Sequence, residues 1–218
     1  MLKDKHFISL KDTPKDDLML LIKTGFSFRE VLERPVKKVP VLSGKNILNL
    51  FFENSTRTKM SFELAEKRLS ADVTNFSSGS SSLNKGETFR DTVQNIQVMK
   101  VDCIVMRHPT PGSCVQLKQF VDSIIINAGD GTHEHPTQAM LDAMSLFERF
   151  KTFDNLKVAI IGDILHSRVA LSNIYALKTL GVEVKLCGPP HLIPTFFSEL
   201  GVEISYNIDE IIDWADAI

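Results

Sequence analysis

Apolar residues along the chain fall into short runs that alternate with segments of helical spacing. The runs predict strands at residues 46–52, 72–76, 102–106, 123–127, 157–163, 182–187 and 202–206. Helical spacing predicts helices at about 14–33, 57–69, 87–100, 113–120, 136–150, 168–180, 192–200 and 208–214. Strands that alternate with helices are typical of parallel β-sheets covered by helices on both faces. We therefore expect an α/β protein.

The helix that begins at Pro136 has the clearest sequence signals. Proline suits the first helical position because its missing N–H is not needed there. Met140, Ala143, Phe147 and Phe150 follow at spacings of three, four and three, so they share one face. This face is predicted to pack against the core.

A polar stretch, "KTFDNLK" at 151–157, separates two series of strands and predicts a boundary between two lobes. We expect one lobe at residues 1–150 and the N-terminal part of another at 151–218, each with a parallel sheet flanked by helices. The second lobe has only three complete strands, and "DWADAI" ends the sequence where another strand begins. We therefore expect the second lobe to be incomplete at its C-terminus.

The composition is that of an ordinary soluble protein. The 218 residues are 43% hydrophobic and 24% charged, with a net charge of −2, which argues against nucleic-acid binding and a polybasic membrane contact. The first twelve residues are too charged for a signal peptide, and no apolar run approaches the roughly 20 residues that span a bilayer. Cys103, Cys114 and Cys187 lack metal-binding spacing, so buried thiols in a reducing cytoplasm are predicted.

Cations, hydroxyls and imidazoles recur just after the predicted strands. Because ligands of open α/β sheets bind beyond the carboxyl ends of the strands, these residues are expected to converge. The segments concerned are 53–58, 77–86, 107–110, 128–138 and 164–168.

Ser55, Thr56, Arg57 and Thr58 stand where a strand gives way to a helix. A helix N-terminus offers unpaired N–H groups and a partial positive charge that suit a phosphate, and arginine adds a planar fork of donors. Taken alone, the four residues favour an ordinary cap made by Ser55 or Thr56, and the other residues of the same sheet edge favour the anion. The two interpretations do not compete, because a helix start rich in hydroxyls can serve both.

Two further segments carry cations after strands. The stretch "SSGSSSLNKG" at 77–86 is either a surface loop or a loop that brings Lys85 and a serine onto an anion and excludes water. Arg107 either caps a strand end or binds an anion.

In "DGTHEHPTQ", His135 lies at the start of the helix and Gln138 in its first turn. Both can donate hydrogen bonds to a carbonyl oxygen on which negative charge develops. His133 is assigned a structural or peripheral role, and zinc is disfavoured because a third ligand of suitable spacing is missing. The segment "VAIIGDILHSR" at 158–168 lacks the glycine pattern of a dinucleotide site, so we expect no cofactor and no metal.

Five motifs, in order, resemble one known family over essentially the whole chain. "FFENSTRTKMSFELAEKRL", "SSLNKGETFRDT", "RHPTPGS", "NAGDGTHEHPTQAMLD" and "GDILHSR" are similar to segments of the aspartate carbamoyltransferases. Ser-Thr-Arg-Thr and His-Pro-Thr-Gln are shared with the ornithine carbamoyltransferases, and the lysine loop with "GDGTHEHPTQ" favours the aspartate enzymes.

The resemblance implies a first lobe that binds carbamoyl phosphate and a second that binds L-aspartate. Ser55, Thr56, Arg57 and Thr58 would hold the phosphate, with Arg107 between phosphate and carbonyl. His135 and Gln138 would contact the carbamoyl group. Arg168 would bind a carboxylate of aspartate.

The resemblance also implies a homotrimer, in which Lys85 and Ser82 reach a neighbouring subunit's site. The loop is one residue shorter than in some relatives, so Ser81 remains an alternative to Ser82. A regulatory chain or another pyrimidine-pathway enzyme is left open as a further partner.

The implied reaction is attack of the α-amine of aspartate on the carbamoyl carbon, which yields N-carbamoyl-L-aspartate and phosphate in pyrimidine biosynthesis. Arg57, Thr58, Lys85, Arg107, His135 and Gln138 would stabilise the charge that develops. The alternatives are ornithine carbamoyltransferase and a catalytically silent anion-binding subunit, since the family's second lobe normally continues with further aspartate-binding residues.

Overall fold

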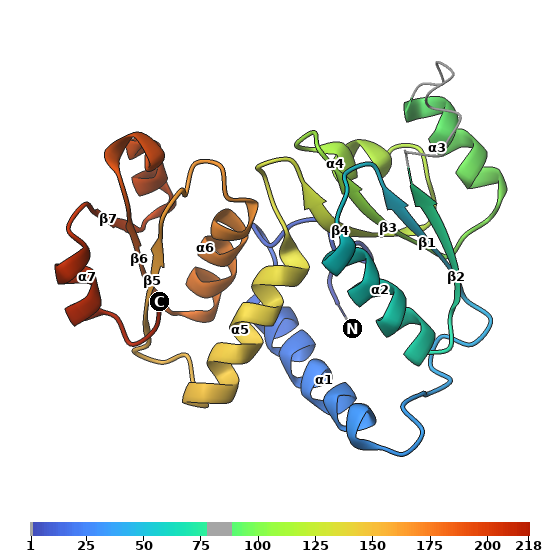
Figure 1. Cartoon of the computed structure of the whole chain (residues 1–218), viewed down its shortest axis with the longest axis horizontal. Coiled ribbons are helices and arrows are strands. Elements are labelled where there is room, and N and C mark those ends of the chain that lie inside the picture. The colour runs from blue at the N-terminus through green and yellow to red at the C-terminus, as the bar shows by residue number, and fades with distance from the viewer. Residues whose placement is uncertain (1, 78–88) are drawn as a thin grey trace. The chain divides into compact units, whose positions relative to one another are not determined.

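The computed structural model describes residues 2–77 and 89–218, which form two compact units (Figure 1). The β1–β4 unit comprises Leu2–Ile8 and Thr24–Gly131, and the β5–β7 unit comprises Ser9–Lys23 and Thr132–Ile218. Helix α1 (Lys15–Glu33) contributes residues to both. Each unit contains a parallel sheet with helices, so the predicted fold class is confirmed.

The β1–β4 unit is built on a four-stranded parallel sheet in the order β2-β1-β3-β4. Its strands are β1 (Asn46–Phe51), β2 (Asp72–Ser77), β3 (Cys103–His108) and β4 (Ile124–Asp130). Its other helices are α2 (Thr56–Arg68), α3 (Phe89–Val98) and α4 (Ser113–Leu117). Since β1 and β3 occupy the centre, the segments that follow them leave the middle of the same edge.

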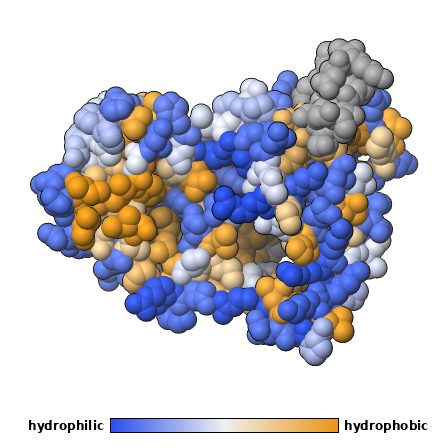
Figure 2. All heavy atoms as spheres, viewed as in Figure 1, coloured by the Kyte–Doolittle hydropathy of each residue, from blue (hydrophilic) through white to orange (hydrophobic). Residues whose placement is uncertain are grey.

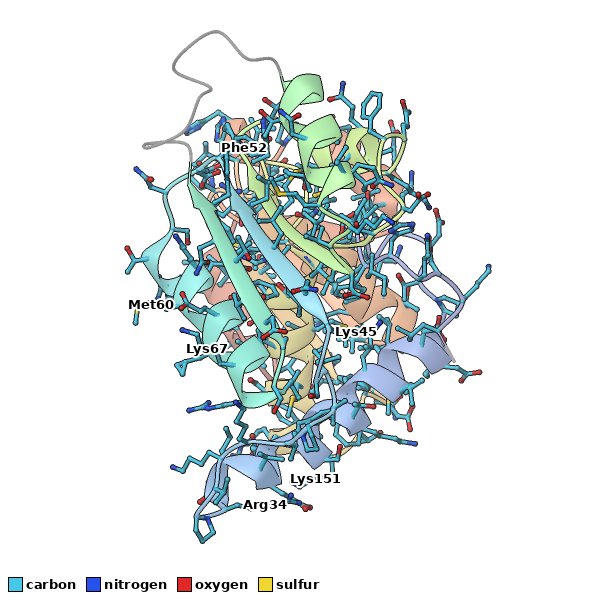
Figure 3. The ribbon with its side chains drawn as sticks, turned by 90° about the vertical axis from the view of Figure 1, so that its right-hand side faces the viewer. Arg34, Lys45, Phe52, Met60, Lys67 and Lys151 are labelled. Carbon is cyan, nitrogen blue, oxygen red and sulfur yellow. The ribbon has the colours of Figure 1, made fainter. Side chains whose placement is uncertain are left out.

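Both faces of this sheet are buried, because alternate strand residues point to opposite sides. Leu50, Ile104 and Met106 pack with residues of α3 and α4 on one face. Phe51 and Val105 pack on the other face, where α2 lies. Figures 1 and 3 show α2 on the side of the sheet opposite α3 and α4.

The β5–β7 unit has a three-stranded parallel sheet in the order β5-β6-β7. Its strands are β5 (Lys157–Ile161), β6 (Glu183–Cys187) and β7 (Glu203–Ser205). Its helices are α5 (Pro136–Phe150), α6 (Arg168–Leu180), α7 (Ile208–Trp214) and two short 3₁₀ helices, η3 (Pro190–Leu192) and η4 (Thr195–Leu200). Of the predicted face of α5, Ala143 is fully buried, whereas Met140, Phe147 and Phe150 are partly buried. Ile174 in α6 is also fully buried.

Strand β5 forms one edge of this sheet, and a groove of about 670 Å³ lies beside it. The groove is lined by side chains of α5, β5 and α6 and by residues 216–218. Ala217 pairs with Val158 in an isolated parallel bridge, which agrees with the predicted start of another strand. Figure 2 shows hydrophobic residues gathered at the surface on the left-hand side of this unit.

One predicted helix was wrong in type, and strands β2, β3 and β4 extend beyond their predicted C-terminal ends. Residues 192–200 do not form one helix, because Pro194 provides no N–H for a continuous turn and disfavours helical backbone before it. β3 continues to His108 and β4 to Asp130, so Arg107 is part of a strand rather than of the loop after it. Within 2–77 and 89–218, no helix is long and apolar enough to cross a membrane.

Candidate active site

The N-terminus of α2 presents an open row of polar side chains. Ser55 is the N-cap residue, with extended backbone at φ −156° and ψ 98°, but its hydroxyl makes no capping hydrogen bond. Thr56 and Arg57 are exposed, and Thr58 is partly buried. Among the described residues, the side chains of all four make no hydrogen bond or ion pair. The first-turn N–H groups and the hydroxyls therefore remain available to an anion.

Arg107 lies beside this helix start, because β3 pairs with β1 and places Arg107 opposite Phe51. Its Nη2 forms an ion pair with Glu53 Oε1 at 2.6 Å, and its Nη1 donates to the Ala128 carbonyl at 3.2 Å. Its Nε is buried and has no partner among the described residues. Since its side chain is only 12% exposed, the guanidinium is held at the sheet edge, and the Nε–H remains uncommitted among the described residues.

A second set of contacts shapes the turn after β4. Asp130 is fully buried and accepts hydrogen bonds from Asn127 Nδ2 at 2.9 Å and from the Gly112 N–H at 2.8 Å. Gly131 has φ +55°, and a Cβ there would lie 2.4 Å from the Pro111 ring. The signal in the sequence for this structural role is "GDG" at residues 129–131, since glycine and aspartate are typical turn residues.

The imidazole of His108, which follows Arg107, accepts a hydrogen bond in this region. Its Nδ1 lies 3.0 Å from the Thr110 N–H and 2.8 Å from Ser113 Oγ, and its ring packs edge-on against Phe52 at 5.0 Å. Burial lowers the pKa of His108, so the neutral imidazole that can accept the Thr110 N–H is favoured. Figure 3 labels Phe52, which directly follows the C-terminal end of β1.

In the β5–β7 unit, His135 is the N-cap residue of α5, with Pro136 as the first helical residue, as predicted. The imidazole is 7% exposed, and its Nδ1 lies 3.3 Å from Thr137 Oγ1. The His135 N–H donates to Ser172 Oγ of α6 at 2.9 Å. The start of α5 is therefore tied to α6 through its backbone.

Gln138 and Arg168 also belong to this unit. Gln138 Nε2 donates to Asp142 Oδ1 at 3.2 Å, and Asp142 also accepts from Asn173 Nδ2 at 2.8 Å. Arg168 is the first residue of α6, where Ser167 Oγ accepts the Ala170 N–H at 3.1 Å. Asp142 and Asn173 were not singled out from the sequence, because the hydrogen bond between them joins two different helices, α5 and α6.

The structure therefore divides the predicted site residues between the units. Ser55, Thr56, Arg57, Thr58 and Arg107 gather at one edge of the β1–β4 sheet, whereas His135, Gln138 and Arg168 belong to the β5–β7 unit. Ser81, Ser82 and Lys85 lie outside the described residues.

Metal-binding and reactive cysteine chemistry find no support in the described ranges. These ranges contain no group of three or more His, Cys, Asp or Glu that could hold a metal ion. All three cysteines are buried and free, as predicted, and burial raises the pKa of Cys103 to about 12. A thiol with such a pKa is a poor nucleophile at neutral pH.

A comparison with protein families matches residues 5–148 to the description "Aspartate/ornithine carbamoyltransferase, carbamoyl-P binding domain". This match covers well over half of the chain. The chain belongs to the aspartate/ornithine carbamoyltransferase family. The family predicted from the five sequence motifs is thus confirmed.

Similar proteins agree on the aspartate branch of the family. The chain is 57% identical over 211 residues to the aspartate carbamoyltransferase catalytic subunit of Christiangramia forsetii and 54% identical over 212 residues to that of Cytophaga hutchinsonii. Each alignment covers 97% of this chain, and 68% and 69% of the respective relatives.

Solved structures of an aspartate transcarbamoylase are also similar to this chain. The Trypanosoma cruzi aspartate transcarbamoylase in complex with carbamoyl aspartate and phosphate matches with a TM-score of 0.88 at 30% identity. That match covers 99% of this chain and 74% of the other. The same enzyme in complex with N-(phosphonacetyl)-L-aspartic acid matches with a TM-score of 0.84 at 31% identity, over 99% and 71% of the two chains.

Proposed function

We propose that this chain is part of an aspartate carbamoyltransferase, which transfers the carbamoyl group of carbamoyl phosphate to the α-amine of L-aspartate. The observation that carries the proposal is the open N-terminus of α2, with the unpaired donors of residues 55–58 beside the guanidinium of Arg107. The names of the relatives at 57% and 54% identity favour aspartate over ornithine as the acceptor.

In the proposed site, the phosphate of carbamoyl phosphate lies at the N-terminus of α2. Its oxygens accept hydrogen bonds from Ser55, Thr56 and Thr58 and a bidentate pair from Arg57. Arg107 bridges the phosphate and the carbonyl oxygen. Glu53 balances the charge of Arg107 and orients its guanidinium before a ligand arrives. Positive charge is thus concentrated at one place in a chain whose net charge is −2.

The reaction requires stabilisation of two developing negative charges. The amine of aspartate attacks the carbamoyl carbon, so charge builds on the carbonyl oxygen and then on the departing phosphate. His135 and Gln138 donate to the carbonyl oxygen, and residues 55–58 with Lys85 stabilise the phosphate. As the new C–N bond forms and the C–O bond to phosphate breaks, the amine transfers a proton to the departing phosphate, which leaves as hydrogen phosphate. Donors fixed in advance avoid the reorganisation that solvent would require.

The proposal also covers the domains of the chain, its assembly and the place where the enzyme works. We assign residues 1–150 to the carbamoyl-phosphate-binding domain, a boundary that the family match over residues 5–148 supports although α5 belongs to the β5–β7 unit by its contacts. Residues 151–218 are the N-terminal part of the aspartate-binding domain, with Arg168 at a carboxylate of aspartate. Subunits form a homotrimer in which Ser82 and Lys85 act in a neighbouring site. The enzyme works in the cytoplasm, in the synthesis of pyrimidines.

One assay tests the reaction. Carbamoyl phosphate is supplied with either L-aspartate or L-ornithine, and the ureido product is quantified. Product with aspartate alone is expected, whereas product with ornithine alone would transfer the chain to the other branch. Phosphonoacetamide binding without product from either acceptor would indicate a catalytically silent anion-binding subunit. Sedimentation of the same protein tests the trimer.

A further inference from the structure

Glu134 is a fully buried carboxylate to which the proposed reaction assigns no role. It accepts hydrogen bonds from Ser9 Oγ, from the Leu10 N–H at 3.0 Å and from Ser172 Oγ at 3.0 Å. These donors come from the segment before α1 and from α6, and Glu134 itself directly precedes α5. One carboxylate therefore joins three parts of the β5–β7 unit that are distant in sequence.

The contact with Ser172 connects this carboxylate to the candidate catalytic histidine. The Ser172 hydroxyl donates its proton to Glu134 Oε2 and accepts the N–H of His135 at 2.9 Å. Because a serine hydroxyl has only one proton, the bond to Glu134 turns the oxygen lone pairs toward His135. The peptide group between Glu134 and His135 is thus held in place by Ser172.

We propose that Glu134 is a positioning residue for His135: through Ser172 and through Ser9 and Leu10, it fixes the backbone from which the imidazole reaches the carbamoyl oxygen. This inference rests on the proposed function, since His135 needs accurate placement only if it donates to a reacting group. A displacement of about 1 Å can reduce turnover by about 100-fold.

The local chemistry explains why a carboxylate suits this position. A buried charge is costly unless hydrogen bonds satisfy it, and three donors converge on Glu134. Glu134 also lies at the N-terminus of α5, where the partial positive charge of the helix favours an anion. An apolar residue of similar volume would leave the Leu10 N–H and the Ser172 hydroxyl without their acceptor.

A purely structural role and a positioning role predict different kinetics. If Glu134 only stabilises the fold, its replacement lowers the unfolding temperature but leaves kcat per folded molecule unchanged. If it positions His135, kcat falls even far below the unfolding temperature. Glu134→Gln separates the two further, because its amide oxygen can accept from Leu10 and Ser172 while its amide nitrogen donates to Ser9 Oγ.

The experiment compares Glu134→Leu, Glu134→Gln and Ser172→Ala in the full chain, with Glu148→Ala as the control on an exposed part of α5. Well below the unfolding temperature, we expect kcat to fall about 10- to 100-fold for Glu134→Leu and about tenfold for Ser172→Ala. Glu134→Gln should retain at least about half of kcat, because it conserves the acceptors. The KM for carbamoyl phosphate should change little, since the phosphate is held by α2.

Amide hydrogen exchange provides a readout that does not depend on turnover. The His135 amide should exchange faster in Glu134→Leu and Ser172→Ala and at the wild-type rate in Glu134→Gln and the control.

Wild-type kcat in folded Glu134→Leu would overturn the proposal, as would a Glu134→Gln enzyme as slow as Glu134→Leu. If the leucine variant does not fold, Ser172→Ala carries the same test. If the wild-type chain forms no product, the proposed function fails, and unchanged His135 exchange would separately overturn the positioning.

Discussion

The N-termini of α2 and α5 both begin after a strand of the β1–β4 sheet, yet they are built differently. At α2, the side chains of the N-cap Ser55 and the neighbouring Arg57 make no hydrogen bond or ion pair among the described residues. At α5, the N-cap His135 is buried and its backbone is bonded to Ser172. An open helix start can admit and release a phosphate by charge attraction. A donor that must meet one carbonyl oxygen needs a fixed direction, which long-range contacts provide.

The largest expected effect tests the open helix start. Arg57→Ala should lower kcat/KM for carbamoyl phosphate about 100- to 1,000-fold, because two charge-assisted hydrogen bonds of about 1.5–2 kcal/mol each are lost. The unfolding temperature should stay within about 1 °C of the wild-type value, since Arg57 is exposed and its side chain makes no hydrogen bond or ion pair in the described structure. Lys67→Ala is the matched control at the other end of α2, where Lys67 points away from the sheet (Figure 3). Near-normal activity of Arg57→Ala would contradict the phosphate site.

A substitution in the turn after β4 should mainly lower the free energy of unfolding. Gly131→Ala forces a Cβ onto the Pro111 ring at φ +55°, so the free energy of unfolding should fall by about 2–4 kcal/mol. Gly44→Ala is the control, because Gly44 also has a positive φ but no atom within 4 Å of the added Cβ. The control should cost only about 1 kcal/mol of backbone strain. If the two variants lose equal free energy of unfolding in urea, the contact with Pro111 does not determine the cost of a side chain in this turn.

Gln138 tests the donor role assigned to α5. Gln138→Ala should lower kcat about 10- to 100-fold, since one donor to the developing oxyanion is removed. Gln138→Glu should be slower still, because a carboxylate repels both that charge and the nearby Asp142. The loss should be the same at low and high salt, whereas phosphate binding at α2 should weaken as salt rises. Wild-type kcat for Gln138→Glu would rule out the donor role.

The smallest effect concerns the buried side of α2. Asn49 Nδ2 donates to Glu66 Oε2 at 2.8 Å, but Asn49 Oδ1 and Glu66 Oε1 have no partner among the described residues. Burial raises the pKa of Glu66, so folding is favoured when this carboxyl is protonated, and stability declines as pH rises above the ordinary pKa. Glu66→Gln supplies an N–H for Asn49 Oδ1 and removes the charge.

For Glu66→Gln we expect about 1 kcal/mol of additional stability at pH 8 and a smaller gain at pH 5, measured by urea unfolding. Glu63→Gln is the control and should show little change, because Glu63 lies at a partly exposed position of the same helix, where it pairs with Lys67. A glutamine variant less stable than the wild type at pH 8 would mean that Glu66 is ionised and satisfied in the folded protein.

Much of the fold was predictable because its signals are local. The alternation of strands and helices, Pro136 at the start of α5 and the buried cysteines were all confirmed. The error at residues 192–200 also had a local cause, since Pro194 was visible within the predicted helix. The residues of the proposed phosphate site, 55–58, could be named from the sequence because they are contiguous and follow one strand.

What the sequence by itself determined is the alternation of elements, the family and the residues able to bind an anion or donate to a carbonyl oxygen. Those features depend on hydrophobic spacing and on runs of neighbouring residues, which each segment carries within itself. Only the tertiary structure decided that Arg107 is paired with Glu53, and that Glu134 joins Ser9, 125 positions away, to Ser172. Such partners meet only when the strands and helices pack, because a hydrogen bond requires contact in space.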